Sequence, residues 1–188
     1  MRVQTEEWRR FIPGSRMYKG KKTLFYNGEI LWDDENEEYL IYDEDEQRSW
    51  EVIIVLPGVE VIPDMSFYEC EKIETVIMSD SVKRIEHDAF YECESLAFVR
   101  LSRNLEYIGR GAFTHCVYLT SIFIPPSCRE IGNEAFCGCK KLIILTVPRH
   151  TTLRDRVIGG AALSRAFRIK TGVSGGLGSR ACDGGGGG

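Results

Sequence analysis

The chain has 188 residues, 43% of them hydrophobic and 28% charged, a composition typical of a soluble globular protein with one domain. The formal net charge is −4, and residues 149–188 hold seven Lys and Arg against two Asp, which gives +5 there and −4 − 5 = −9 elsewhere. An acidic body of this kind argues against nucleic-acid binding.

The hydropathy pattern also bears on membrane association. No apolar run approaches the roughly 18 residues that a transmembrane helix needs. The amino terminus has no apolar stretch like that of a secretory signal. We therefore expect no membrane span and a cytoplasmic location, in which thiols stay reduced.

Residues 1–49 are predicted to form an amino-terminal segment that contains a β cap. Residues 23–33 are typical of a hairpin, because Asn27 and Gly28 favour the positive φ values of a tight turn. A third strand is predicted at residues 39–42. The acidic runs of this segment lack the ligand spacing and the Gly of a calcium loop, so we expect solvated loops.

From residue 59 the sequence repeats every 23 residues, four times, without insertion or deletion. A fixed period in this range indicates a solenoid, in which each unit buries its apolar face against its neighbours. Residues 50–57 match the last part of a unit, so five stacked strands are predicted over residues 50–150. The four full units are 59–81, 82–104, 105–127 and 128–150.

The two halves of each unit have different periodicities. The second half alternates aliphatic residues with a period of two, which predicts a strand that pairs in parallel with its neighbours. The first half carries Ile, Phe and Cys at spacings typical of a short helical turn. The Phe and Cys positions are Phe67, Phe90, Phe113 and Phe136, and Cys70, Cys93, Cys116 and Cys139.

These units resemble the leucine-rich repeat family in its BspA-like form, which has an Ala-Phe-x-x-Cys core and is expanded in bacteria and in protists, diatoms included. The match is close in residues 85–101, which read Ile85-Glu-His-Asp-Ala-Phe-Tyr-Glu-Cys-Glu-Ser-Leu-Ala-Phe-Val-Arg-Leu. The resemblance covers residues 59–148. It implies an α/β leucine-rich-repeat solenoid, with a parallel β-sheet on the concave side, short helical turns on the convex side and protein binding as the usual role.

The outward positions of the predicted strands form the candidate binding site. Solvent-facing strand positions are normally polar, yet six of these ten are apolar, and a contiguous apolar patch marks an interaction surface. Phe98, Arg100 and Phe123 are the predicted anchors. Two alternatives remain: the cap or the tail covers this face, or β-propensity alone explains the residues. The predicted partner-binding residues are Val52, Ile54, Thr75, Ile77, Phe98, Arg100, Ser121, Phe123, Ile144 and Thr146.

No catalytic, cofactor-binding or metal-binding residue is predicted. Cysteines spaced 23 apart fall in a line rather than a tetrahedron, which favours core packing of free thiols, whereas Cys137 is expected to face outward. The histidines share no register with one another or with a carboxylate partner. The sequence has no phosphate-binding loop and no pairing of a nucleophile with a base.

Residues 151–188 are predicted to form a basic, Gly-rich, disordered tail, and residues 151–154 keep no register with the repeat. The sequence thus predicts a non-catalytic module that binds a protein or peptide. One alternative is a structural repeat protein with weak self-association through its open ends and exposed sheet. Another is a redundant, truncated member of an expanded repeat family.

Overall fold

The computed structural model describes residues 21–28, 32–33, 38–39 and 50–159. Most residues of the predicted acidic loops and of the third cap strand, and residues 160–188 of the predicted tail, lie outside these residues. Within the described part of the chain, no helix is long and apolar enough to cross a membrane.

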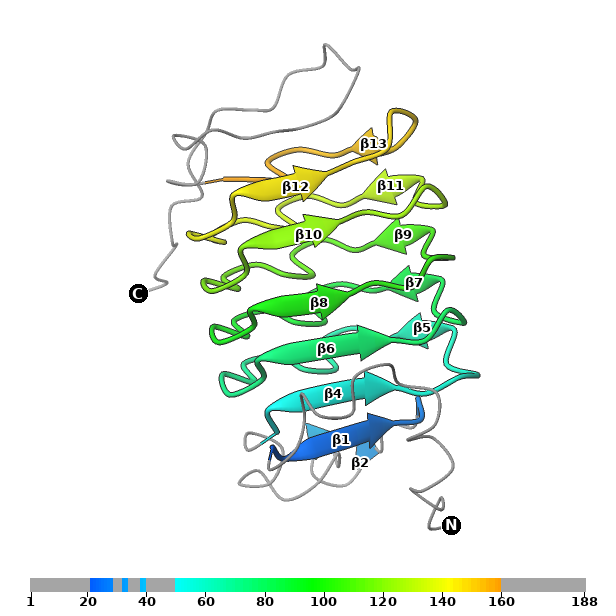
Figure 1. Ribbon diagram of the computed structural model, residues 1–188, viewed down its shortest axis with the longest axis vertical. Coiled ribbons are helices and arrows are strands. Elements are labelled where there is room, and N and C mark those ends of the chain that lie inside the picture. The colour runs from blue at the N-terminus through cyan, green and yellow to red at the C-terminus, as the bar shows by residue number, and fades with distance from the viewer. Residues whose placement is uncertain (1–20, 29–31, 34–37, 40–49, 160–188) are drawn as a thin grey trace.

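The chain winds into a solenoid of about four turns, and parallel strands stack on one face of it (Figure 1). We call this face the front sheet. Hydrogen bonds join its strands in the orders β1-β4-β6-β8 and β10-β12, and β10 lies against β8. Its members are β1 (Thr23–Tyr26), β4 (Val52–Val55), β6 (Thr75–Met78), β8 (Phe98–Arg100), β10 (Ser121–Phe123) and β12 (Ile144–Thr146).

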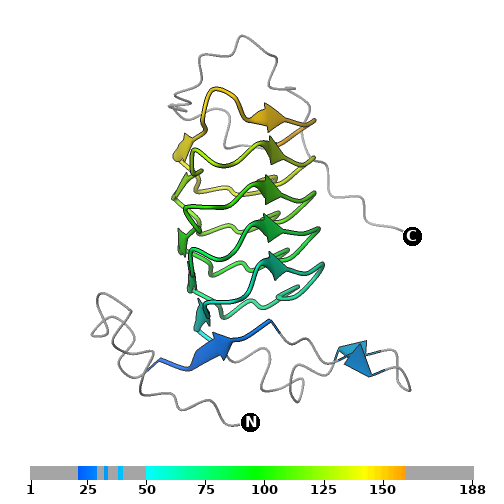
Figure 2. The same ribbon diagram turned by 90° about the vertical axis from the view of Figure 1, so that its right-hand side faces the viewer.

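A second parallel sheet lies on another side of the coil (Figure 2). This back sheet consists of two-residue strands in the order β13-β11-β9-β7-β5. Ile62, Ile85, Ile108 and Ile131, assigned from the sequence to a helical turn, are strand residues here. The strands are β5 (Val61–Ile62), β7 (Arg84–Ile85), β9 (Tyr107–Ile108), β11 (Glu130–Ile131) and β13 (Thr152–Leu153).

The predicted helical turns are wrong, because the described residues contain no helix and the fold is a parallel β-solenoid rather than α/β. The amide of Phe67 donates to the carbonyl of Ala89 in the next turn at 2.8 Å, so it is not available for a helical bond within its own turn. The amides of Phe90 and Phe113 donate in the same way to the carbonyls of Ala112 and Ala135 in the turns that follow them. Glu69 and its equivalent Glu92 have φ values of 55° and 54°, which a right-handed helix excludes.

The core is a set of side-chain columns, one residue from each turn. The four Phe rings are buried and stack nearly parallel, with 5.1 Å between the centroids of Phe67 and Phe90 and 5.5 Å between those of Phe113 and Phe136. The inward strand residues predicted by alternation are also buried, which confirms the strand register. Those residues are Ile53, Val55, Val76, Met78, Val99, Leu101, Ile122, Ile124, Leu145 and Val147.

The cysteine column is part of this core, as predicted. Cys70, Cys93, Cys116 and Cys139 are buried free thiols. The Cys93 and Cys139 Sγ atoms each donate to a Phe carbonyl of the preceding turn at 3.1 Å. Cys137 contradicts the prediction, because it is buried and disulfide-bonded.

We expect Cys93, Cys116 and Cys139 to resist alkylation in the native protein. Burial raises the pKa of Cys93 and Cys116 well above the usual value, and that of Cys139 to about 12. Thiolate is the reactive form, so both burial and the raised pKa suppress reaction. Peptide mass spectrometry after iodoacetamide treatment at pH 8 should find these positions unlabelled in buffer and labelled in guanidinium. Labelling within minutes in buffer would contradict the packing.

The amino-terminal cap differs from the predicted hairpin. β1 pairs in parallel with β4, and Phe25 aligns with Ile54. β2 (Trp32–Asp33) pairs in antiparallel fashion with β3 (Glu38–Tyr39) instead. Tyr26 of β1 packs edge-on against Phe67, with 5.3 Å between ring centroids, and so extends the aromatic column by one ring. β1 therefore completes the core of the first turn.

The back sheet continues past His150. β13 pairs with β11, with Thr152 aligned to Glu130, so residues 151–154 keep the fold at a spacing one residue shorter than the repeat. The Phe136 amide donates to the Val157 carbonyl at 2.8 Å, which extends the stack of turns. The prediction that residues 151–154 keep no register with the repeat is wrong. The unit is one residue shorter here, so the register is not visible at a period of 23. The division of the chain at residues 49 and 150 stays a prediction.

Candidate protein-binding surface

The front sheet presents two outward columns, since alternate residues of each strand point away from the core. In the first column Thr75 aligns with Phe98, and Ser121 with Ile144. In the second column Ile77 aligns with Arg100, and Phe123 with Thr146. The parallel register therefore sets the predicted site residues of β6 to β12 in two rows across the face.

The apolar residues of this face are exposed where the last three strands lie. Phe98 is 48% exposed, Phe123 64% and Ile144 41%. Tyr118 and Ile143, each 51% exposed, lie on the turns before β10 and β12. We call these five residues, Phe98, Tyr118, Phe123, Ile143 and Ile144, the front patch.

The sequence prediction missed Tyr118 and Ile143 because it considered strand positions only. A signal was present in the repeat itself. The equivalents of Tyr118 in the other units are Lys72, Ser95 and Lys141, and those of Ile143 are Glu74, Ala97 and Thr120. An apolar residue at a repeat position that is polar or small in the other units indicates an exposed apolar side chain. The alternation of inward and outward strand residues does not reveal it.

Two predicted site residues do not face solvent. Val52 is 0% exposed and Ile54 is 5% exposed, so the prediction that they are accessible is wrong. Both lie in β4, between β1 and β6. Thr75, Ile77, Ser121 and Thr146 are partly buried. The accessible apolar surface is therefore smaller than predicted and lies toward β12.

Arg100 is exposed, but its guanidinium is held by its own chain. It donates to the carbonyl of Met78 at 2.7 Å and lies 3.5 Å from Asp80. Arg103 also pairs with Asp80, at 3.2 Å. A partner of the front patch would have to compete with these contacts to use Arg100, which makes Phe98 and Phe123 the better anchors.

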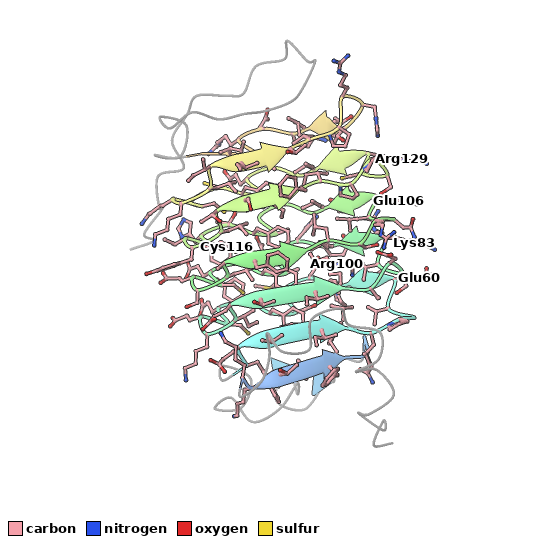
Figure 3. The ribbon with its side chains drawn as sticks, in the orientation of Figure 1. Glu60, Lys83, Arg100, Glu106, Cys116 and Arg129 are labelled. Carbon is pink, nitrogen blue, oxygen red and sulfur yellow. The ribbon has the colours of Figure 1, made fainter. Side chains whose placement is uncertain are left out.

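A column of alternating charge runs along another edge of the stack, through Glu60, Lys83, Glu106 and Arg129 (Figure 3). The amides of Lys83, Glu106 and Arg129 each donate to the carbonyl of the column residue one turn earlier, at 2.7 to 2.8 Å. These bonds bring opposite charges side by side. The Lys83 Nζ atom lies 3.0 Å from the Glu60 carboxylate. Alternating signs favour this stacking register, because like charges on adjacent strands repel.

One histidine does have a carboxylate neighbour, contrary to the prediction. His115 Nδ1 lies 3.5 Å from the Glu92 carboxylate, and the His115 ring stacks on Tyr91. Burial and the neighbouring Glu92 raise the pKa of Tyr91 to about 12. Among the residues that the structure describes, no group of three His, Cys, Asp or Glu is arranged to hold a metal ion.

Among proteins of known structure, several bacterial leucine-rich repeat proteins share this fold. A leucine-rich repeat protein of T. pallidum is 27% identical, with a TM-score of 0.53, over 61% of this chain and 54% of that chain. One from Bacteroides ovatus is 27% identical, with a TM-score of 0.58, over 62% of this chain and 32% of that one. A leucine rich cell surface protein of Faecalibacterium prausnitzii is 27% identical, with a TM-score of 0.60, over 66% of this chain and 32% of that one.

This chain therefore spans only a third to about half of the length of these proteins. No curated protein matches the sequence. The family profile of the BspA type leucine rich repeat region matches residues 52–171, well over half of the chain. Leucine-rich repeats of this kind are generally protein-interaction modules and typically non-catalytic. The chain belongs to the BspA-type leucine-rich repeat family.

Proposed function

We propose that this protein is a non-catalytic interaction module that binds a protein or peptide through its front sheet. The observation that carries the proposal is the exposure of Phe98 and Phe123 on strands whose outward positions are normally polar. Aromatic residues are enriched at the centres of protein interfaces and depleted on other surfaces. The family's general role in protein interaction also supports it.

The proposal depends on a limited area. The front patch extends over β8, β10 and β12, the Val52 and Ile54 side chains are buried, and Arg100 is engaged with Asp80. A partner is therefore expected to contact the half of the sheet toward β12. A cytoplasmic location and the absence of catalysis stay predictions from the sequence.

Replacing Phe98 and Phe123 by Ala together is expected to abolish partner capture. Truncation of a central aromatic anchor costs about 2 kcal/mol or more in binding, so two losses weaken a micromolar complex by about a thousandfold. Quantitative mass spectrometry of proteins retained from host extract by the immobilised chain measures the effect.

The matched control is Val61→Ala, which removes an exposed apolar side chain from the back sheet. It should retain the same proteins as the unaltered chain. If the double variant retains them too, with an unchanged melting temperature, the front patch is not the binding surface.

A further inference from the structure

We propose that the partner of the front patch is a second copy of this chain, related by a twofold axis that runs along β10. This inference rests on the proposed function, because it names the partner of the same surface. It follows from how the exposed side chains are distributed about β10, and from the charges that flank them.

A twofold axis that runs parallel to the strands, just beyond the outer face of β10, turns the second front sheet to face the first. The strand direction is kept and the order of the turns is reversed, so β8 faces β12 of the second copy. Phe98 and Ile144 occupy the same column, and therefore meet across the interface. Phe123 lies on the axial strand and meets its own equivalent.

The turns before the strands match in the same way. Ile143, 51% exposed, faces the exposed Ala97 of the second copy, so a large side chain meets a small one. Tyr118 faces its own equivalent. An isologous interface requires this self-complementarity, in which one patch supplies both partners. Phe98, Phe123, Ile143 and Ile144 thus find an apolar counterpart. The Tyr118 ring carries the Lys141 ammonium 3.5 Å from its centroid, so the two Tyr118 rings meet beside these cations.

Charges at the edge of the patch are complementary under the same operation. Glu94 and Lys140 are exposed, and each lies four residues before the first residue of its strand, β8 or β12. Glu94 therefore faces Lys140 of the second copy, and the pair occurs twice. At the opposite edge Arg103 faces Arg149 of the second copy, and its pairing with Asp80 at 3.2 Å reduces that repulsion.

The experiment is a charge swap measured by sedimentation equilibrium of the full chain, with and without reductant. The unaltered chain should form a weak dimer, with a Kd on the order of 10 µM for an interface this small. Glu94→Lys and Lys140→Glu should each weaken it about tenfold, because two attractive pairs become repulsive. The variant with both changes should regain the original Kd.

Neither reversal should change the melting temperature, since both side chains are exposed. A monomer at 200 µM, or a double reversal no tighter than the single ones, would overturn the inference. The proposed function fails separately, when the Phe98 and Phe123 double variant captures all that the unaltered chain captures. If the chain is a monomer and captures another protein only when Phe123 is present, the proposed function holds but the partner is not a second copy.

Discussion

Replacing Phe113 by Ala is expected to lower the free energy of unfolding by about 3–5 kcal/mol. The Phe113 ring is 0% exposed and lies between two others, with centroids 5.2 Å from Phe90 and 5.5 Å from Phe136. Its removal loses the transfer free energy of the ring, two stacking contacts and the packing around the cavity. Urea denaturation followed by circular dichroism measures the change.

Phe123→Ala is the matched control, because it removes the same ring from a site that is 64% exposed. Its effect should stay below about 0.5 kcal/mol, as for most surface substitutions. A Phe113→Ala variant that loses less than about 1 kcal/mol would contradict the aromatic column. Since each turn contacts only its neighbours, hydrogen exchange should rise most in the turns that carry Phe90, Phe113 and Phe136.

The sequence predicts this column because the period of 23 residues is constant. A position that recurs at each turn of a solenoid must stack on itself, so Phe67 to Phe136 and Cys70 to Cys139 had to form columns. Alternation then assigns the strand residues to the inside or the outside. The structure confirms the columns, the burial of the inward residues and the exposure of Phe98 and Phe123, but Val52 and Ile54, also assigned to the outside, are buried.

The features that the sequence did not predict depend on contacts between distant residues. The spacing of Ile85, Phe90 and Cys93 suits a helix, and only the bonds from one turn to the next, such as Phe90 to Ala112, show why none forms. β1 pairs with β4 at a spacing of 29 residues, as between Thr23 and Val52, and so does not follow the 23-residue period.

The second large effect is expected at Gly132, where Ala should cost about 3 kcal/mol. A Cβ atom there would lie 2.6 Å from the Arg110 amide nitrogen and 2.7 Å from the Gly109 carbonyl carbon. Both are backbone atoms of the preceding turn, so no side-chain rotation relieves the contact. The two turns would have to move apart, which weakens the hydrogen bond from the Gly132 amide to the Ile108 carbonyl, now 2.8 Å.

Glu86→Ala is the control for Gly132→Ala, since Glu86 occupies the same repeat position two turns earlier and already carries a Cβ atom. It removes only the exposed ion pair with Arg84, and should change stability by less than about 1 kcal/mol. Equal melting temperatures for the two variants would mean that the turns separate freely at this position. A large loss at Gly132 alone would instead show that the spacing between turns is set by backbone contact as well as by the side-chain columns.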